Sequence, residues 1–139
     1  MRILIVEDDA VLGMVASAAL EGEGHAVAGP AFSVAEAQAL AASGKADLAL
    51  VDINLDGHDE GIALARSLRA QFGIPSIFVS GQVAAARANR DAALGLLPKP
   101  YDIDDLIAIV ARVPGIGARG GLPGNFEVFA DPAPERAGA

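Results

Sequence analysis

The chain has 139 residues, 53% of them hydrophobic, which suffices for one domain with a sizeable core and is too short for two ordinary domains. Its net charge of −8 argues against a surface for nucleic acid or anionic membrane, because both need clustered basic residues. The lack of cysteine excludes disulfides, thiolate nucleophiles and cysteine-ligated zinc. The start is no signal peptide and no run reaches the ~20 apolar residues of a membrane span, so we expect a cytoplasmic protein.

Short apolar runs alternate with amphipathic stretches along the chain. The apolar runs predict strands at 3–6, 25–29, 46–51, 76–79 and 95–97. The amphipathic stretches predict helices over 9–23, 33–43, 60–72, 83–93 and 102–113. Three of these helices begin with a residue suited to capping, namely Asp9, Ser33 and Asp102. This alternation predicts an α/β fold with a doubly wound, five-stranded parallel sheet.

The end of the chain differs in composition from the rest, since ten of the residues in 114–139 are Gly or Pro. We expect residues 1–113 to form the domain and 114–139 to form a largely flexible tail without a separate output domain. Within this tail, the segment 125–129 is apolar enough to pack on the domain.

The last predicted helix has a wide apolar stripe. Ile109 and Val113 extend this stripe beyond what contact with one sheet face requires. Two interpretations remain open. Either the tail covers these residues through Phe126 and Phe129, or they form a surface for a partner or a second copy of the chain.

Polar residues follow four of the predicted strands at their carboxyl ends, where open α/β sheets bind ligands. In chain order they are Glu7, Asp8, Asp52, Asn54, Ser80, Gly81 and Lys99. Neighbouring carboxylates repel each other unless they are protonated or bind a cation, and hard oxygen ligands suit Mg²⁺. Such a cation beside a Lys and a Ser would stabilise a phosphoryl group, which a carboxylate can accept. Asp52 is the natural acceptor, because it stands at a strand end facing Asp8.

Over about residues 1–113 the chain resembles the receiver domains of the response-regulator family in two-component signalling. The matching motifs are Ile-Val-Glu7-Asp8-Asp9, Leu-Val-Asp52-Ile-Asn54, Val-Ser80-Gly81 and Pro-Lys99-Pro100. All four occur in the family's order, each at the carboxyl end of a strand. The resemblance implies a flavodoxin-like or CheY-like (βα)5 fold with strand order 2-1-3-4-5, here as a stand-alone, single-domain regulator.

The resemblance also implies roles for the acidic residues. Asp52 would accept the phosphoryl group. Glu7, Asp8 and Asp52, together with the main-chain carbonyl of Asn54, would hold Mg²⁺ or Mn²⁺. Apart from these roles, Asn54 and Gln82 are candidates for tuning the lifetime of the phosphoryl group, because both amides can orient or exclude water; an ordinary loop role for them stays open.

The remaining motif residues are implied to surround the phosphoryl group. Ser80 and Lys99 would contact it, and Gly81 would leave room for the donor. The Lys99–Pro100 peptide bond is expected to be cis, a state that X-Pro bonds adopt at low cost. Leu96 occupies the position where the family often has a Tyr or Phe that acts as a switch, so we do not expect aromatic gating there.

The resemblance implies a sensor histidine kinase or a histidine phosphotransfer protein as donor, and a downstream protein as output partner. A homodimer through the face of helix 83–93, strand 95–97 and helix 102–113 is a further expectation. We expect self-phosphorylation and self-dephosphorylation rather than enzymatic turnover. One alternative is a Mg²⁺-dependent phosphatase acting through an aspartyl phosphate, although the nucleophile is not on the first strand and no cap segment exists. A flavin or nucleotide carrier would need a Gly-rich loop after the first strand, which is missing.

Overall fold

The structure is a computed structural model that describes residues 1–55, 58–113 and 124–129. Its strands are β1 (Arg2–Val6), β2 (Ala26–Ala31), β3 (Leu48–Val51), β4 (Ser76–Ser80), β5 (Gly95–Pro98) and β6 (Glu127–Val128). Its α-helices are α1 (Ala10–Gly22), α2 (Val34–Ser43), α3 (Glu60–Phe72), α4 (Val83–Ala88) and α5 (Ile103–Ala111). In the described part of the chain, no helix has the length and apolar content needed to cross a bilayer.

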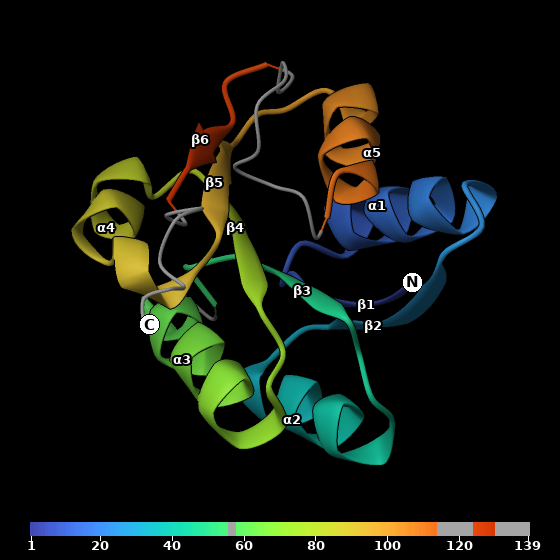
Figure 1. The fold of residues 1–139 in the computed structure, drawn as a ribbon, viewed down its shortest axis with the longest axis horizontal. Coiled ribbons are helices and arrows are strands. Elements are labelled where there is room, and N and C mark those ends of the chain that lie inside the picture. The colour runs from blue at the N-terminus through green and yellow to red at the C-terminus, as the bar shows by residue number, and fades with distance from the viewer. Residues whose placement is uncertain (56–57, 114–123, 130–139) are drawn as a thin grey trace, which may run out of the picture.

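The strands form one sheet in the order β2-β1-β3-β4-β5-β6 (Figure 1). Strands β1 to β5 pair with one another in parallel, as the alternation of strands and helices predicted. Helices α1 and α5 cover one face of the sheet, while α2 and α3 lie on the other (Figure 1). The predicted doubly wound α/β fold with strand order 2-1-3-4-5 is therefore confirmed.

Each face of the sheet has its own apolar core, because successive side chains of a strand point to opposite faces. In β1, Leu4 and Val6 belong to the core under α2 and α3, whereas Ile3 and Ile5 belong to the core under α1 and α5. All four side chains are at most 3% exposed. Strands buried on both faces are continuously apolar, which is why the short apolar runs located them in the sequence.

The predicted helix 83–93 is shorter in the structure. Helix α4 ends at Ala88, and a single 3₁₀ turn, Arg90–Ala92, follows it. Asn89 separates the two, with φ −129° and a side-chain amide that donates to the carbonyl of Ala85. An Asn side chain that bonds to nearby backbone competes with helix continuation, so the helix stops there.

The sheet has a sixth strand that the sequence did not predict. Strand β6 runs antiparallel to β5, with Gly95 opposite Val128 and Leu96 opposite Glu127. The segment 125–129 was expected to pack somewhere on the domain, and it does so as an edge strand. Gly95 makes this possible, because a Cβ at this position would collide with the carbonyl oxygen of Glu127.

The apolar stripe of α5 is covered rather than open at Ile109. Ile109 has no exposed surface and belongs to the core under α1 and α5, so it is not available for the partner or dimer surface proposed from the sequence. Val113 is half-buried, and Phe126 packs against the same core. Phe129 instead packs against the core on the opposite face.

Candidate functional site

Strands β1 and β3 bring the acidic residues together. They are parallel neighbours in register, with Val6 beside Val51, so the residues that follow them emerge at the same edge of the sheet. Glu7, Asp8 and Asp52 each offer a carboxylate oxygen, and these oxygens lie within 4.8 Å of one another. The convergence expected from the sequence is thus present in the fold.

Lys99 reaches this acidic cluster from the end of β5. Its Nζ lies 2.7 Å from Glu7 Oε1 and 2.9 Å from Asp52 Oδ2. The backbone N–H of Lys99 donates to the carbonyl of Ser80 at 3.0 Å, which places the start of the side chain beside the end of β4. Lys99 therefore bridges the two carboxylates across the end of an intervening strand. The Lys99–Pro100 peptide bond is cis, as is Gly29–Pro30.

Burial and charge act together on the ionisation of this cluster. Glu7 is 7% exposed and Asp52 is 6% exposed, whereas Asp8 is exposed. Burial raises the pKa of Glu7, the negative charge of Asp52 raises it further, and the hydrogen bond from Lys99 offsets part of this rise. Although burial opposes ionisation of Lys99, its bonds to Glu7 and Asp52 leave its pKa above the usual value. Lys99 is the internal counter-ion of the two buried carboxylates.

The donor set suits a hard divalent cation. Three carboxylates from neighbouring strands supply oxygen atoms at close range, and Mg²⁺ binds through few carboxylates while it keeps several waters. The backbone N–H of Asn54 donates to Asp52 Oδ1 at 3.3 Å, which holds the start of the following loop against the site. The buried amide oxygen of Asn54 has no hydrogen-bond partner in the described structure. These residues fit a magnesium ion.

The polar residues at the end of β4 lie as the sequence predicted, at the same edge of the sheet. Ser80 is fully buried, and its Oγ accepts a hydrogen bond from the backbone N–H of Gln82 at 3.1 Å. Gly81 is exposed, and a Cβ at this position would meet nothing within 4 Å. The space beside Gly81 is therefore open. Gln82 is also exposed and precedes α4.

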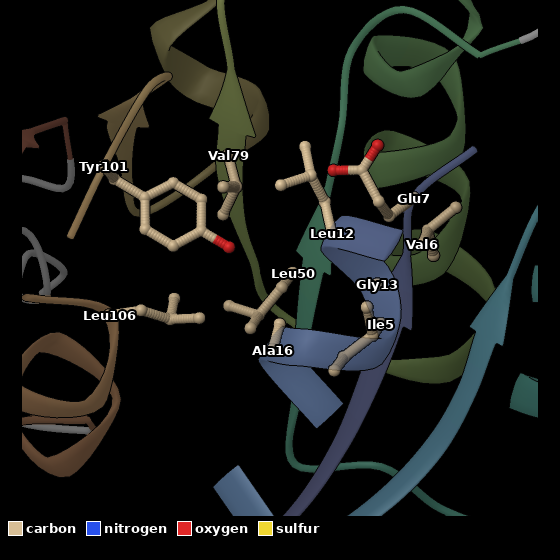
Figure 2. Close-up of a pocket in the computed structure, with 10 residues that line it drawn as sticks. All are labelled: Ile5, Val6, Glu7, Leu12, Gly13, Ala16, Leu50, Val79, Tyr101 and Leu106. Atoms are coloured by element: carbon tan, nitrogen blue, oxygen red, sulfur yellow. The ribbon is translucent and has the colours of Figure 1, made fainter. Parts of the chain in front are cut away.

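Tyr101, which follows the Lys-Pro pair, lies close to the site. Its ring is half-buried, and the hydroxyl points toward the side chains of Val79, Leu12 and Leu50 (Figure 2). It lines a cavity of about 10 Å³ that Glu7 also lines, which is about the space that one water occupies. Burial raises the pKa of Tyr101, and the charge of Glu7 raises it further. Leu96, at the family's usual aromatic position, is fully buried in the opposite core.

Gly61 packs against the backbone of Asp52, a contact that the sequence did not predict. A Cβ at this position would collide with the carbonyl oxygen of Asp52 and the Cα of Ile53. The N–H of Gly61 also donates to the carbonyl of Ile53 at 2.8 Å. The first turn of α3 thus packs directly on the backbone that carries the central carboxylate. A glycine in the first turn of a predicted helix is the only signal in the sequence.

Comparison with protein families gives a match to the response regulator receiver domain over residues 3–111. Among curated proteins, the chain is 33% identical over 112 residues to the transcriptional regulatory protein PdtaR of Mycobacterium tuberculosis, covering 78% of this chain and 54% of the relative. It is 30% identical over 113 residues to the phyllosphere-induced regulator PhyR of Methylorubrum extorquens, covering 80% of this chain and 42% of the relative. The chain thus spans about half the length of these curated relatives.

Solved structures give the same result. The receiver domain of NtrX from Brucella abortus matches with a TM-score of 0.72 at 28% identity, over 79% of this chain and 95% of that chain. A CheY-like receiver domain protein from Methanospirillum hungatei matches with a TM-score of 0.69 at 28% identity, over 80% of this chain and 90% of that chain. The fold, the four motifs at one sheet edge and the family match agree, and the chain belongs to the response regulator receiver domain family of two-component signalling.

Proposed function

We propose that the chain is a phosphorylation-controlled switch that accepts a phosphoryl group on Asp52 from a phosphohistidine. The observation that supports this most strongly is the position of Asp52, buried at a strand end between an acidic cluster and Lys99 Nζ at 2.9 Å. Phosphoryl transfer depends mainly on positioning and charge neutralisation, and this cluster offers both.

In the proposed step, a carboxylate oxygen of Asp52 attacks the phosphorus atom and the bond from phosphorus to the donor imidazole nitrogen breaks. The imidazole leaves with the bonding electron pair and takes up a proton. A Mg²⁺ held by Glu7, Asp8, Asp52 and the main-chain carbonyl of Asn54 would supply positive charge against the phosphoryl oxygens. Lys99, whose Nζ lies 2.9 Å from Asp52 Oδ2, would neutralise further charge on the product.

Residues at the end of β4 and just after it respond to the product in this mechanism. The Oγ of Ser80, 3.1 Å from the N–H of Gln82 before phosphorylation, would instead donate its proton to a phosphoryl oxygen. The open space beside Gly81 admits the donor. Asn54 and Gln82 would set the lifetime of the aspartyl phosphate by positioning water. A shift of this β4–α4 loop would carry the signal to the adjoining surface.

The donor, a sensor histidine kinase or a histidine phosphotransfer protein, would dock on α1. This helix exposes Val11 to 68%, Met14 to 64% and Val15 to 50%. A groove of about 390 Å³ lies between Val15 and Lys99, so the apolar surface is continuous with the acceptor site. We place the switch in the cytoplasm, where such donors act. Its output would be contact with a downstream protein or a second copy at the face formed by α4, β5 and α5, where β6 now lies.

The decisive experiment is incubation of the full chain with acetyl phosphate and Mg²⁺, followed by intact mass measurement. We expect a gain of one phosphoryl group, its slow loss, and no gain in Asp52→Asn. Asp104→Asn, which changes an exposed carboxylate on α5, is the matched control and should label normally. Labelling of Asp52→Asn would contradict the proposal. Continued turnover of phosphate esters would favour the aspartyl-phosphate phosphatase instead.

A further inference from the structure

Strand β6 lies on the edge of β5, beside α4 (Figure 1). Its ladder is short, since only Glu127 and Val128 are paired with β5. The N–H of Phe129 adds one more bond, to the carbonyl of Leu94 at 2.8 Å. The backbone edge of β5 is therefore the kind of surface to which an extended peptide adds as a strand.

Two arginines beside β5 recognise this segment. Arg87 on α4 donates from Nε to Glu127 Oε1 at 2.9 Å and from Nη2 to Oε2 at 2.5 Å, a bidentate pair. Arg90 donates from Nη2 to the carbonyl of Val128 at 3.3 Å, and its guanidinium lies 4.7 Å from the ring centroid of Phe129. In a chain of net charge −8, this edge gathers positive charge against one acidic residue.

Aromatic side chains anchor both ends of the segment on opposite faces of the sheet. Phe129 is only 8% exposed and packs in the core beside α4. Phe126 packs against the core under α5. The ring of Phe126 and the carbonyl of Glu127 occupy the space that a side chain at Gly95 would need, so the segment fits here only beside a glycine. The surface thus selects a strand with the pattern aromatic, acidic, any residue, aromatic.

The polar contacts that hold β6 are few and partly exposed to water. A two-residue ladder makes few backbone hydrogen bonds, and the side chain of Arg87 is 59% exposed to water in its ion pair. The segment 126–129 occupies a surface that offers the backbone edge of β5, the positive charges of Arg87 and Arg90, and a site for an aromatic ring on each face of the sheet. Any extended strand with the same pattern can use them.

We propose that the β5 edge with Arg87 and Arg90 is a strand-docking site for a partner protein, and that this partner inserts an extended aromatic-acidic-x-aromatic segment in place of β6. The occupant follows from charge complementarity to the arginines and from the pattern of the resident strand. The proposal concerns an interface and does not depend on phosphorylation of Asp52, so each can fail without the other.

The test uses the full chain with Glu127→Gln and Phe129→Ala, which removes the ion pair and one aromatic anchor from the resident strand. Hydrogen exchange at the amide of position 129 should lose its protection. A fluorescein-labelled peptide of residues 124–129 should then bind at least about tenfold more tightly than to the wild-type chain, because a tethered strand competes at millimolar effective concentration. Fluorescence anisotropy measures both affinities.

Specificity is tested by exchanging charges. Adding Arg87→Glu to the released chain should weaken binding of the peptide at least about tenfold, and a peptide with Lys in place of the acidic residue should restore it. Arg69→Glu, which makes the same charge change on α3, is the control and should leave binding unchanged.

Three results would overturn the proposal. The first is retained amide protection at position 129, which would show that these anchors do not hold the strand. The second is no saturable peptide binding to the released chain, or binding indifferent to Arg87→Glu. The third is a released chain that dimerises by size-exclusion chromatography and excludes the peptide, since a second copy would then be the occupant.

Discussion

At the scale of single residues, Lys99 holds two buried carboxylates that would otherwise repel each other. It contacts Glu7 at 2.7 Å and Asp52 at 2.9 Å, and its side chain is 20% exposed. Residue types and positions predicted that Glu7, Asp52 and Lys99 would meet, because the carboxyl ends of parallel strands share an edge. The sequence could not predict that the ammonium group of Lys99 would bridge both carboxylates. This contact depends on the distance from β5 to β3 and β1, and β4 lies between them.

Lys99→Ala is expected to destabilise the fold at neutral pH by about 2 kcal/mol. Removing one partner of a fully buried ion pair costs roughly 3–5 kcal/mol, and this site is partly exposed. The pKa of Glu7 in the folded chain is raised above its usual value of 4.5. Glu7 therefore contributes to the free energy of unfolding most favourably below pH 4.5, and this contribution is lost as the pH rises through the folded-state pKa. Without the hydrogen bond from Lys99 this pKa rises further, and the loss of stability with rising pH becomes steeper.

Urea unfolding of the wild-type and Lys99→Ala chains between about pH 5 and about pH 8 measures this difference. Mg²⁺ should raise the melting temperature of the variant more than that of the wild-type chain, because the cation replaces the lost positive charge. Parallel pH profiles for the two chains would contradict the role given to Lys99.

At the scale of secondary-structure elements, local signals located most helix starts. Asp9 accepts hydrogen bonds from the N–H groups of Val11 and Leu12, as an N-cap does. Ser33 accepts from the N–H of Glu36, which is the spacing that predicted this start. Asp102 also precedes its helix, but its side chain makes no capping hydrogen bond there. The end of α4 was missed, because the Ala-rich stretch after residue 83 has no breaker as strong as Gly or Pro.

Contact between α3 and β3 leads to a prediction at Gly61. Gly61→Ala would force a Cβ onto the carbonyl of Asp52, and we expect a loss of roughly 1–3 kcal/mol, as for other overpacked sites. Labelling of Asp52 by acetyl phosphate should also slow, because the backbone that carries the carboxylate must move.

Gly22→Ala is the matched control for Gly61→Ala. Gly22 is the last residue of α1, and a Cβ there would meet nothing within 4 Å. This change should be neutral or stabilise by up to about 1 kcal/mol, since Ala is the better helix former. Thermal unfolding separates the two, and an equal response of both variants would contradict the packing role of Gly61.

At the scale of the whole molecule, helices α1 and α5 cover the same face of the sheet but leave different surfaces (Figure 1). Helix α1 exposes large apolar residues beside the proposed acceptor site, whereas apolar residues of α5 are buried in a core against which Phe126 packs. The donor and the output partner are therefore proposed to use separate faces. A donor that docks on α1 would meet the proposed acceptor edge of the sheet, and an output partner would meet the edge of β5 where β6 lies.

Met14→Asp is expected to leave labelling by acetyl phosphate unchanged, because Met14 is 64% exposed on α1 and does not belong to the acceptor site. Transfer from a histidine kinase that labels the wild-type chain should fall about tenfold, the effect of losing one interface contact worth about 1.4 kcal/mol. Ala70→Asp, exposed near the end of α3, is the control and should transfer normally. Equal transfer to all three chains would remove α1 from the donor interface.

The sequence by itself predicted the parallel α/β fold and the candidate residues of the proposed acceptor site, and its resemblance to receiver domains implied the strand order. The fold class follows from residue types and short-range periodicity, which the chain carries locally. Only the tertiary structure decided that β6 pairs with β5, that Ile109 is buried and that Gly61 supports Asp52. Each of these depends on which distant segments come into contact, and the packing of the complete fold determines those contacts.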